Sequence, residues 1–162
     1  MSSGKILAER VVGLSGWSFQ AVKITVDCFM SPGMMVVAGE YDSADVISNN
    51  TFEIQRSGAR QIEVSLVLPG QELGELTVTS CLDEYSLVPG RIEHLLALGA
   101  QHPDIQRKFP IVALGSKTRT GKPRVGMLKA QEIKRTVYRE FKLVHRNMVF
   151  PAYSAFLAIP KP

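Results

Sequence analysis

The two-residue alternation of apolar and polar side chains, which recurs in short segments, is the feature that most constrains the fold of this chain. In residues 61–69 four apolar side chains share one parity, namely Ile62, Val64, Leu66 and Leu68. Successive side chains of a β-strand point to opposite faces, so this pattern predicts a strand with one buried face. Similar runs between short turn sequences predict further strands at 17–30, 34–39, 51–56, 75–82, 111–116, 124–129 and 152–160.

Two segments depart from simple alternation. The apolar parity of residues 17–30 changes near Ala21, which predicts a β-bulge or a bend at that point. Residues 134–147 fit the spacing of a helix and that of a strand, and their Thr, Val, Tyr and Phe residues favour a strand. Short turns, such as the Ser-Pro-Gly sequence at 31–33, are expected to link most of these strands.

Helical spacing replaces the alternation in the middle of the chain. The sequence RIEHLLALG carries apolar residues on one helical stripe and predicts a helix at about 90–100. The sequence HPDIQRKFP, which contains proline near its start and at its end, predicts a short helical turn at about 103–108. We therefore expect an α+β protein of mainly β structure, an antiparallel sheet or partly open barrel covered by these two helical pieces.

Charge is distributed unevenly along a chain whose 162 residues predict a single domain, 1–162. Its parts are an acidic, strand-rich part at 1–88, a helical insert at 89–109 and a basic, strand-rich part at 110–162. Residues 1–103 contain six Lys and Arg against twelve Asp and Glu, whereas the remaining residues contain thirteen against three. Because a field of one sign attracts polyanions, the basic part predicts an anionic partner, with nucleic acid as the main candidate. The alternative is that the two halves neutralise each other within the fold.

The candidate nucleic-acid contacts form two groups. The first is a hairpin turn expected at 117–124, with four cations at its tip and Gly121 able to adopt a positive φ. The second mixes cations with Tyr138, on which a base of a single strand can stack. The alternative for both groups is a solvated surface. Together the candidates are Lys117, Arg119, Lys122, Arg124, Lys134, Arg135, Tyr138, Arg139, Lys142 and Arg146.

The same hairpin turn superficially resembles a phosphate-binding loop. In such a loop four residues separate a glycine from Gly-Lys-Ser/Thr, whereas five residues separate Gly115 from Gly121. Pro123 occupies the position of the metal-binding hydroxyl and lacks a backbone N–H. We therefore expect neither a bound nucleotide nor any other cofactor.

Residues suited to catalysis or to metal binding are few and lack recognised spacing. The histidines, His94, His102 and His145, accompany no nucleophile motif. Cys28 and Cys81 lie far apart in apolar runs and are expected to be reduced core thiols, and a single disulfide between them in an exported protein is the alternative. The acidic residues Glu40, Asp42 and Asp45 do not have EF-hand spacing and predict a solvated loop. A non-enzymatic binding protein without a metal site is the favoured interpretation.

A Met-rich turn at 29–37 supports an alternative function. If exposed, its side chains Phe29, Met30, Met34 and Met35 form an adaptable apolar surface for a protein partner. The protein would then be an interaction module or a homo-oligomer that uses this turn or an edge strand. The sequence contains no apolar run long enough for a membrane span and no signal peptide, which predicts a cytoplasmic protein without a membrane partner.

Overall fold

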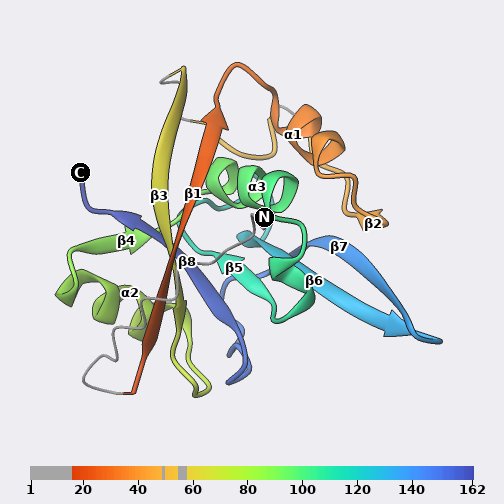
Figure 1. Ribbon diagram of the computed structural model, residues 1–162. Helices are drawn as coiled ribbons and strands as arrows, with labels where there is room; N and C mark the ends of the chain where they lie inside the picture. Colours follow the sequence, from red (N-terminus) through yellow and green to blue (C-terminus); the bar gives the residue numbers. More distant parts are fainter. Residues whose placement is uncertain (1–15, 49, 55–57) are drawn as a thin grey trace.

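The computed structural model describes residues 16–48, 50–54 and 58–162, and Figure 1 shows the arrangement of its elements. The strands join in one open sheet of order β1-β3-β8-β5-β6-β7-β2, with β4 paired to β8. The strands are β1 (Ser18–Asp27), β2 (Ser43–Ala44), β3 (Ala59–Leu68), β4 (Leu87–Pro89), β5 (Ile111–Ala113), β6 (Arg124–Ile133), β7 (Thr136–His145) and β8 (Ala155–Pro160). The helices are α1 (Pro32–Ala38), α2 (Glu75–Glu84), α3 (Ile92–Gln101) and the 3-10 turn η1 (Ile105–Arg107).

The sheet is mixed, whereas the alternation predicted an antiparallel sheet or partly open barrel. Strands β1, β3, β6 and β7 pair in antiparallel fashion, but β5 runs parallel to β8 and β2 runs parallel to β7. The parallel pairing of β5 arises because β8, the last strand, inserts between β3 and β5. Alternation shows which side chains are buried but carries no information on which strands become neighbours. The prediction of a mainly β protein is confirmed.

Two apolar clusters hold helices on the sheet. The larger cluster packs α3 and α1 against side chains of β1, β3 and β6, and the smaller one packs α2 and Trp17 against β8 and β5. Helix α3 confirms the helix predicted at about 90–100. It buries Ile92, Leu95 and Leu98 completely, so its apolar stripe faces the sheet. The short turn predicted at about 103–108 is η1.

The segment predicted as a strand at 34–39 lies in helix α1 and in the residue that follows it. Ser31 caps this helix, since its Oγ accepts a hydrogen bond of 3.2 Å from the backbone N–H of Met34. Pro32 occupies the first turn, where its missing N–H is not needed. The Ser-Pro pair was the helix signal, and the apolar run after it was too short to show a helical period.

The segment predicted as a strand at 75–82 is also helical and forms most of α2. Only Val78 and Leu82, four residues apart, are fully buried, while Leu76 is exposed. Thr77 and Thr79, which flank Val78, imitate a strand pattern, but packing on β4 and the sheet selects the helix. Residues 51–54 are not in a strand, and the rest of the strand predicted there includes residues outside the described ranges. Of the two alternatives predicted near Ala21, a bulge or a bend, the bulge is absent, because β1 pairs with β3 without interruption from 18 to 27.

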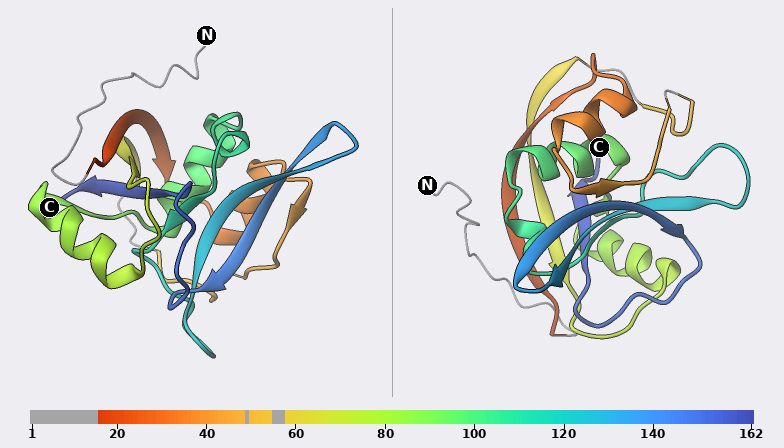
Figure 2. Two further views of the ribbon diagram at one scale, coloured as in Figure 1. Left: turned by 90° about the horizontal axis from the view of Figure 1, so that it is seen from below. Right: turned by 90° about the vertical axis from the view of Figure 1, so that its right-hand side faces the viewer.

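Strands β6 and β7 form a long hairpin that extends away from the helices (Figures 1 and 2). Its two-residue turn consists of Lys134 and Arg135, both at positive φ, as in the turns that suit the twist of a tight hairpin. The strand favoured at 134–147 is therefore confirmed as β7, and the strand predicted at 124–129 extends to Ile133 as β6. All eight residues from 131 to 138 are exposed.

The longest helices in the described part of the chain have ten residues, and none of them could cross a lipid bilayer.

Candidate nucleic-acid interface

The predicted turn at 117–124 connects β5 to β6 and is exposed at its tip. The backbone N–H of Thr118 donates to the Arg124 carbonyl, and the N–H of Arg124 donates to Thr118 Oγ1, both at 3.0 Å. Gly121 has a φ of 73°, which a residue with a side chain rarely adopts. Arg119, Lys122 and Arg124 are exposed. These cations lie at one end of β6, and Lys134 and Arg135 lie at the other, about 30 Å away for a ten-residue strand.

Lys117 and Arg146, two further candidate contacts at this end of β6, form ion pairs with a carboxylate. Glu75, the first residue of α2, is 3.5 Å from Lys117 Nζ and 3.2 Å from Arg146 Nε. Its side chain is mostly buried, so it links the loop after β5 and the loop after β7 to one helix terminus. Glu75 belongs to the acidic part of the chain, and the charge of these two cations is therefore partly neutralised within the fold.

Arg139 is buried, which corrects its prediction as a surface contact. Its side chain is 5% exposed, and its guanidinium donates to the carbonyls of Gly39 and Gly99, each at 2.7 Å, and to Gln106 Oε1 at 3.0 Å. Desolvation lowers the pKa of this guanidinium, although an arginine stays charged at neutral pH. Arg139 thus ties α1, α3 and η1 to β7, and its charge is not available to a phosphate.

Tyr41 completes the surroundings of Arg139. The guanidinium carbon lies 4.8 Å from the centre of the Tyr41 ring, and burial raises the pKa of this tyrosine to about 12. A Cβ atom at either Gly39 or Gly99 would overlap the Tyr41 ring, so both glycines are required for this packing.

The acidic loop is exposed, as the sequence predicted, and two of its carboxylates also bond the backbone of β7. Asp42 Oδ2 accepts from the backbone N–H of Arg139, and Asp45 Oδ2 accepts from that of Leu143, both at 2.7 Å. The backbone N–H groups of Asp42 and Asp45 donate in turn to carbonyls of β7. The two carboxylates therefore protect the outer edge of β7, where β2 supplies only two residues.

The register of the hairpin decides which side chains share a face. Lys129 lies opposite Glu140, Gln131 opposite Tyr138, and Met127 opposite Lys142. Because these directly paired residues point to the same side, Tyr138, Lys129 and Lys142 lie on one face of the hairpin. The other face carries Arg139 and Phe141 and is covered by α3.

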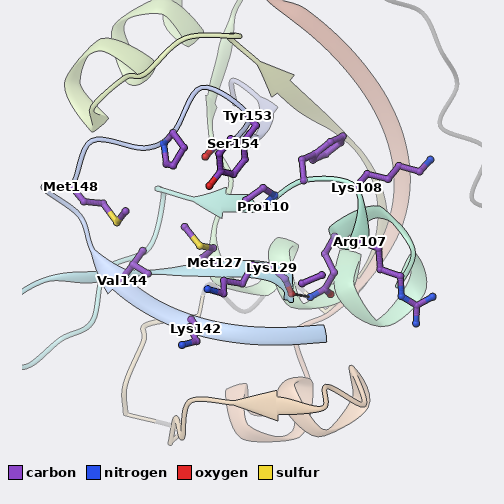
Figure 3. A pocket seen from close by; sticks show the side chains of 14 residues that line it. Arg107, Lys108, Pro110, Met127, Lys129, Lys142, Val144, Met148, Tyr153 and Ser154 are labelled. Carbon is purple, nitrogen blue, oxygen red and sulfur yellow. Dashed lines mark hydrogen bonds between the residues drawn. The ribbon is translucent and has the colours of Figure 1, made fainter. Parts of the chain in front are cut away.

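A pocket of about 450 Å³ opens on this face of β6 and β7. One wall carries Pro110, Tyr153 and Ser154, and the opposite wall carries Met127, Lys129 and Val144 (Figure 3). Arg107 and Lys108 lie at the rim with their side chains directed away from its middle. Arg107 also bonds Asp104 at 2.6 Å. The pocket is thus mainly apolar inside and cationic at its margin.

The polar groups of the pocket differ in how fully they are paired. The closest approach of Lys129 Nζ to Glu140 is 4.0 Å, which is too long for a hydrogen bond. Lys142 is half-buried and forms no ion pair within the described residues. Ser154 is 1% exposed, and its Oγ has no hydrogen-bond partner among the described groups. Tyr153, in contrast, is 65% exposed.

Of the residues that line the pocket, only Lys142 was predicted as a site residue, and the unpredicted ones include Lys108, Tyr153 and Ser154. These three come from segments 107–110 and 148–154, which reach the β6–β7 face only because β8 pairs with β5. No pattern within a single stretch of the sequence indicates that these two segments contact the β6–β7 face. The interleaving of cations with Tyr138 was the only signal in the sequence that pointed to this face.

A small cavity of about 40 Å³ brings Cys28 and His94 together, but their geometry does not suit catalysis. His94 Nδ1 accepts from the backbone N–H of Arg91 at 2.9 Å, so the proton of the neutral ring is on Nε2. Burial, with the nearby charges of Arg60 and Arg91, lowers the pKa of His94 to about 4. His94 therefore holds the start of α3 and has no free basic nitrogen for the Cys28 thiol.

The other predicted groups have the following positions. Phe29 and Met34 are 78% and 58% exposed, Met30 is half-buried, and Met35 of α1 is buried. Cys28 and Cys81 are free thiols. Within the described ranges, no group of three His, Cys, Asp or Glu side chains has the arrangement of a metal site.

Comparison with models of known protein families, with curated proteins and with solved structures gave no match for this chain.

Proposed function

We propose that this is a non-enzymatic protein that binds single-stranded nucleic acid on one face of the β6–β7 hairpin. We call this surface the basic face, and it comprises Lys129, Tyr138 and Lys142 of the hairpin, with Lys108 and Tyr153 across the pocket. The observation that carries the proposal is the register of β6 with β7, which aligns cations and an exposed aromatic ring on one side. Such surfaces bind single strands because phosphates pair with the cations and bases stack on the rings.

The dimensions of the basic face favour a single strand. From Thr136 to Val144 the face extends for about 27 Å, at roughly 3.4 Å per strand residue. Tyr138 and Tyr153 are both partly open to solvent, at 39% and 65% exposure. A base has to leave its stack to contact either ring, which an unpaired strand does at little cost, whereas a duplex must first open. Lys134 and Arg135 at the hairpin tip extend the positive charge in the same direction.

The test measures the salt dependence of binding to a labelled oligonucleotide. In the variant Lys108→Gln/Lys142→Gln, the slope of log affinity against log salt should flatten by up to about 1.4 on a single strand, because each phosphate that is no longer neutralised accounts for about 0.7. The matched control, Lys23→Gln/Lys161→Gln, removes two charges elsewhere and should leave the slope unchanged. Absence of binding by the unaltered protein at low salt would refute the proposal, as would equal effects of the two double variants.

Tyr138→Ala tests stacking separately from charge. It should weaken single-strand binding by about 1–3 kcal/mol and leave the salt slope as it is, because the substitution removes a ring and no cation. Unchanged affinity would show that bases do not stack at Tyr138.

An apolar patch on and beside α1 favours a second candidate function, a protein-interaction module or homo-oligomer. Phe29, Met34 and Val37 are 78%, 58% and 76% exposed, and a cluster of large exposed apolar side chains marks interaction surfaces. Size-exclusion chromatography with light scattering should then give a mass that rises with concentration. The variant Met34→Gln/Val37→Gln should remain monomeric over the same range. A monomer at all concentrations would remove self-association and leave a different protein partner.

A further inference from the structure

We infer that the pocket on the basic face takes one unstacked nucleobase, with its phosphate held at the mouth by Lys129 and Lys142. The inference rests on the proposed function and adds a location at which one base of the bound strand is selected. The same chemistry is found in a free nucleoside monophosphate, so the strand and the free nucleotide are two sources of one ligand class.

The interior of the pocket suits a flat heterocycle. Phe109, Pro110, Met127, Met148 and Pro151 contribute to its lining, and its volume of about 450 Å³ is within the range of small-ligand sites. Methionine side chains adapt their shape to an inserted ring and make favourable contacts with aromatic faces. Tyr153 lies on the wall opposite Met127, so a ring that enters the pocket lies between an aromatic side chain and a methionine (Figure 3).

Ser154 supplies a polar group that is otherwise unexplained. Its hydroxyl is buried on the pocket wall without a hydrogen-bond partner among the described groups, an arrangement that native structures usually avoid. The amide of Gln106, which also lines the pocket, already donates to the carbonyls of Lys129 and Glu140 at 2.7 and 3.2 Å. The Ser154 hydroxyl therefore has no protein partner among the described groups that competes with the edge of a base, and a hydroxyl can both donate and accept.

The charges around the pocket place the phosphate at its mouth. Lys129 is not hydrogen-bonded to Glu140, and Lys142 is unpaired within the described residues, so both ammonium groups can contact an anion. The Glu140 carboxylate beside Lys129 disfavours a second anion deeper in the fold. A neutral base inside the pocket is compatible with the Glu140 carboxylate, and a phosphate at the mouth can contact both ammonium groups.

The experiment compares short single-stranded oligonucleotides that each lack one base, by fluorescence anisotropy. One abasic position should lower the affinity by roughly 5- to 150-fold, the equivalent of the stacking loss of a single base, and the other positions should have smaller effects. Short oligonucleotides that differ only in the base at that position should bind with different affinities. Ser154→Ala should reduce this inequality, and the control Val149→Ala, an exposed neighbour outside the pocket, should not.

Nucleoside monophosphates are tested in the same way to separate the two sources. If they bind with a Ser154-dependent preference and oligonucleotides do not bind, the pocket is a nucleotide site and the proposed function is wrong. If oligonucleotides bind and every abasic position has the same effect, the base pocket is wrong and the proposed function stands. Absence of binding by both classes refutes both. If Ser154→Ala folds poorly, Tyr153→Ala takes its place, because Tyr153 is exposed. Removal of this ring should reduce the loss of affinity that the abasic position causes.

Discussion

Two strand pairs of equal length, β1–β3 and β6–β7, differ in how much of each is buried against the rest of the molecule. Each pair contains ten consecutive residue pairs. In β1, every second residue from Val22 to Val26 is buried under α3, whereas residues 131–138 of the other pair are all exposed. The β1 and β3 strands carry two cations and two carboxylates, but the β6–β7 hairpin with its turn carries six cations and two carboxylates.

The difference shows that similar backbone pairing can be stabilised in two ways. Apolar burial holds the β1–β3 pair along its length. The β6–β7 pair is held at its base by apolar side chains and further along by polar contacts of Arg139, Asp42 and Asp45. Its distal part adds little burial, so the side chains there contribute little to packing and stay exposed.

The largest expected effect comes from Arg139, the polar anchor of the hairpin. Arg139→Gln should lower the free energy of unfolding by about 3–5 kcal/mol, because the carbonyls of Gly39 and Gly99 remain buried without donors. Urea denaturation measures the loss. Arg139→Lys should recover little of it, since one ammonium group cannot reproduce the fork of the guanidinium. The nearby control Lys142→Gln should change stability by less than about 0.5 kcal/mol. Equal stability of the Arg139 and Lys142 variants would contradict the account of this anchor.

A second substitution pair compares apolar burial at the two strand pairs directly. Ile24→Ala in β1 should cost about 2–5 kcal/mol, because Ile24 is 2% exposed and its removal leaves a cavity under α3. Ile133→Ala near the hairpin tip should cost less than about 1 kcal/mol, since Ile133 is 45% exposed. The same urea titrations provide both values. A large loss at Ile133 would mean that the distal hairpin is packed against something, such as a second copy of the chain.

Acid should weaken the β1–β3 side of the molecule through His94. The pKa of His94 is about 4 in the folded protein and 6.5 in the unfolded chain, so the unfolded state binds more protons between these values. Stability attributable to this group is fully present above pH 6.5 and is lost as pH falls to 4, by about 3 kcal/mol in total. His94→Asn keeps an acceptor for the Arg91 N–H and should flatten the stability profile in that window. An unchanged profile would show that His94 is not buried in its neutral form.

The sequence predicted those parts of the fold whose signals are local and long. Helix α3 has a full apolar stripe that begins soon after Pro89, β3 alternates from Ile62 to Leu68, and the Thr, Val, Tyr and Phe residues of 134–147 favoured the strand β7. Helices α1 and α2 were missed because a seven-residue helix shows less than two full turns of periodicity and because threonines imitate a strand. The mixed sheet was missed because it depends on where β8 inserts.

The candidate site was predictable only in part, for the same physical reason. Arg139 shares its parity on β7 with the core residue Phe141, and this signal could have placed it inside. Tyr138 and Lys142 share the opposite parity and therefore point to the same face of β7. Tyr153 and Ser154 lie on a loop whose position depends on a long-range strand pairing, and no pattern in the sequence places them beside Lys142.

The smallest expected effect concerns the exposed turn at 117–124, which lies beyond the base of the same hairpin. Lys122→Gln/Arg124→Gln should change stability by less than about 0.5 kcal/mol, because both side chains are exposed. A short oligonucleotide on the basic face does not reach this turn, so its affinity and salt slope should stay unchanged. A longer single strand can reach it, and its slope should then flatten by up to about 1.4, since two phosphates at about 0.7 each are no longer neutralised. If the double substitution lowers the affinity for the short oligonucleotide as much as for the long one, the strand binds at the turn. The face that the register of β6 with β7 creates is then not its binding site.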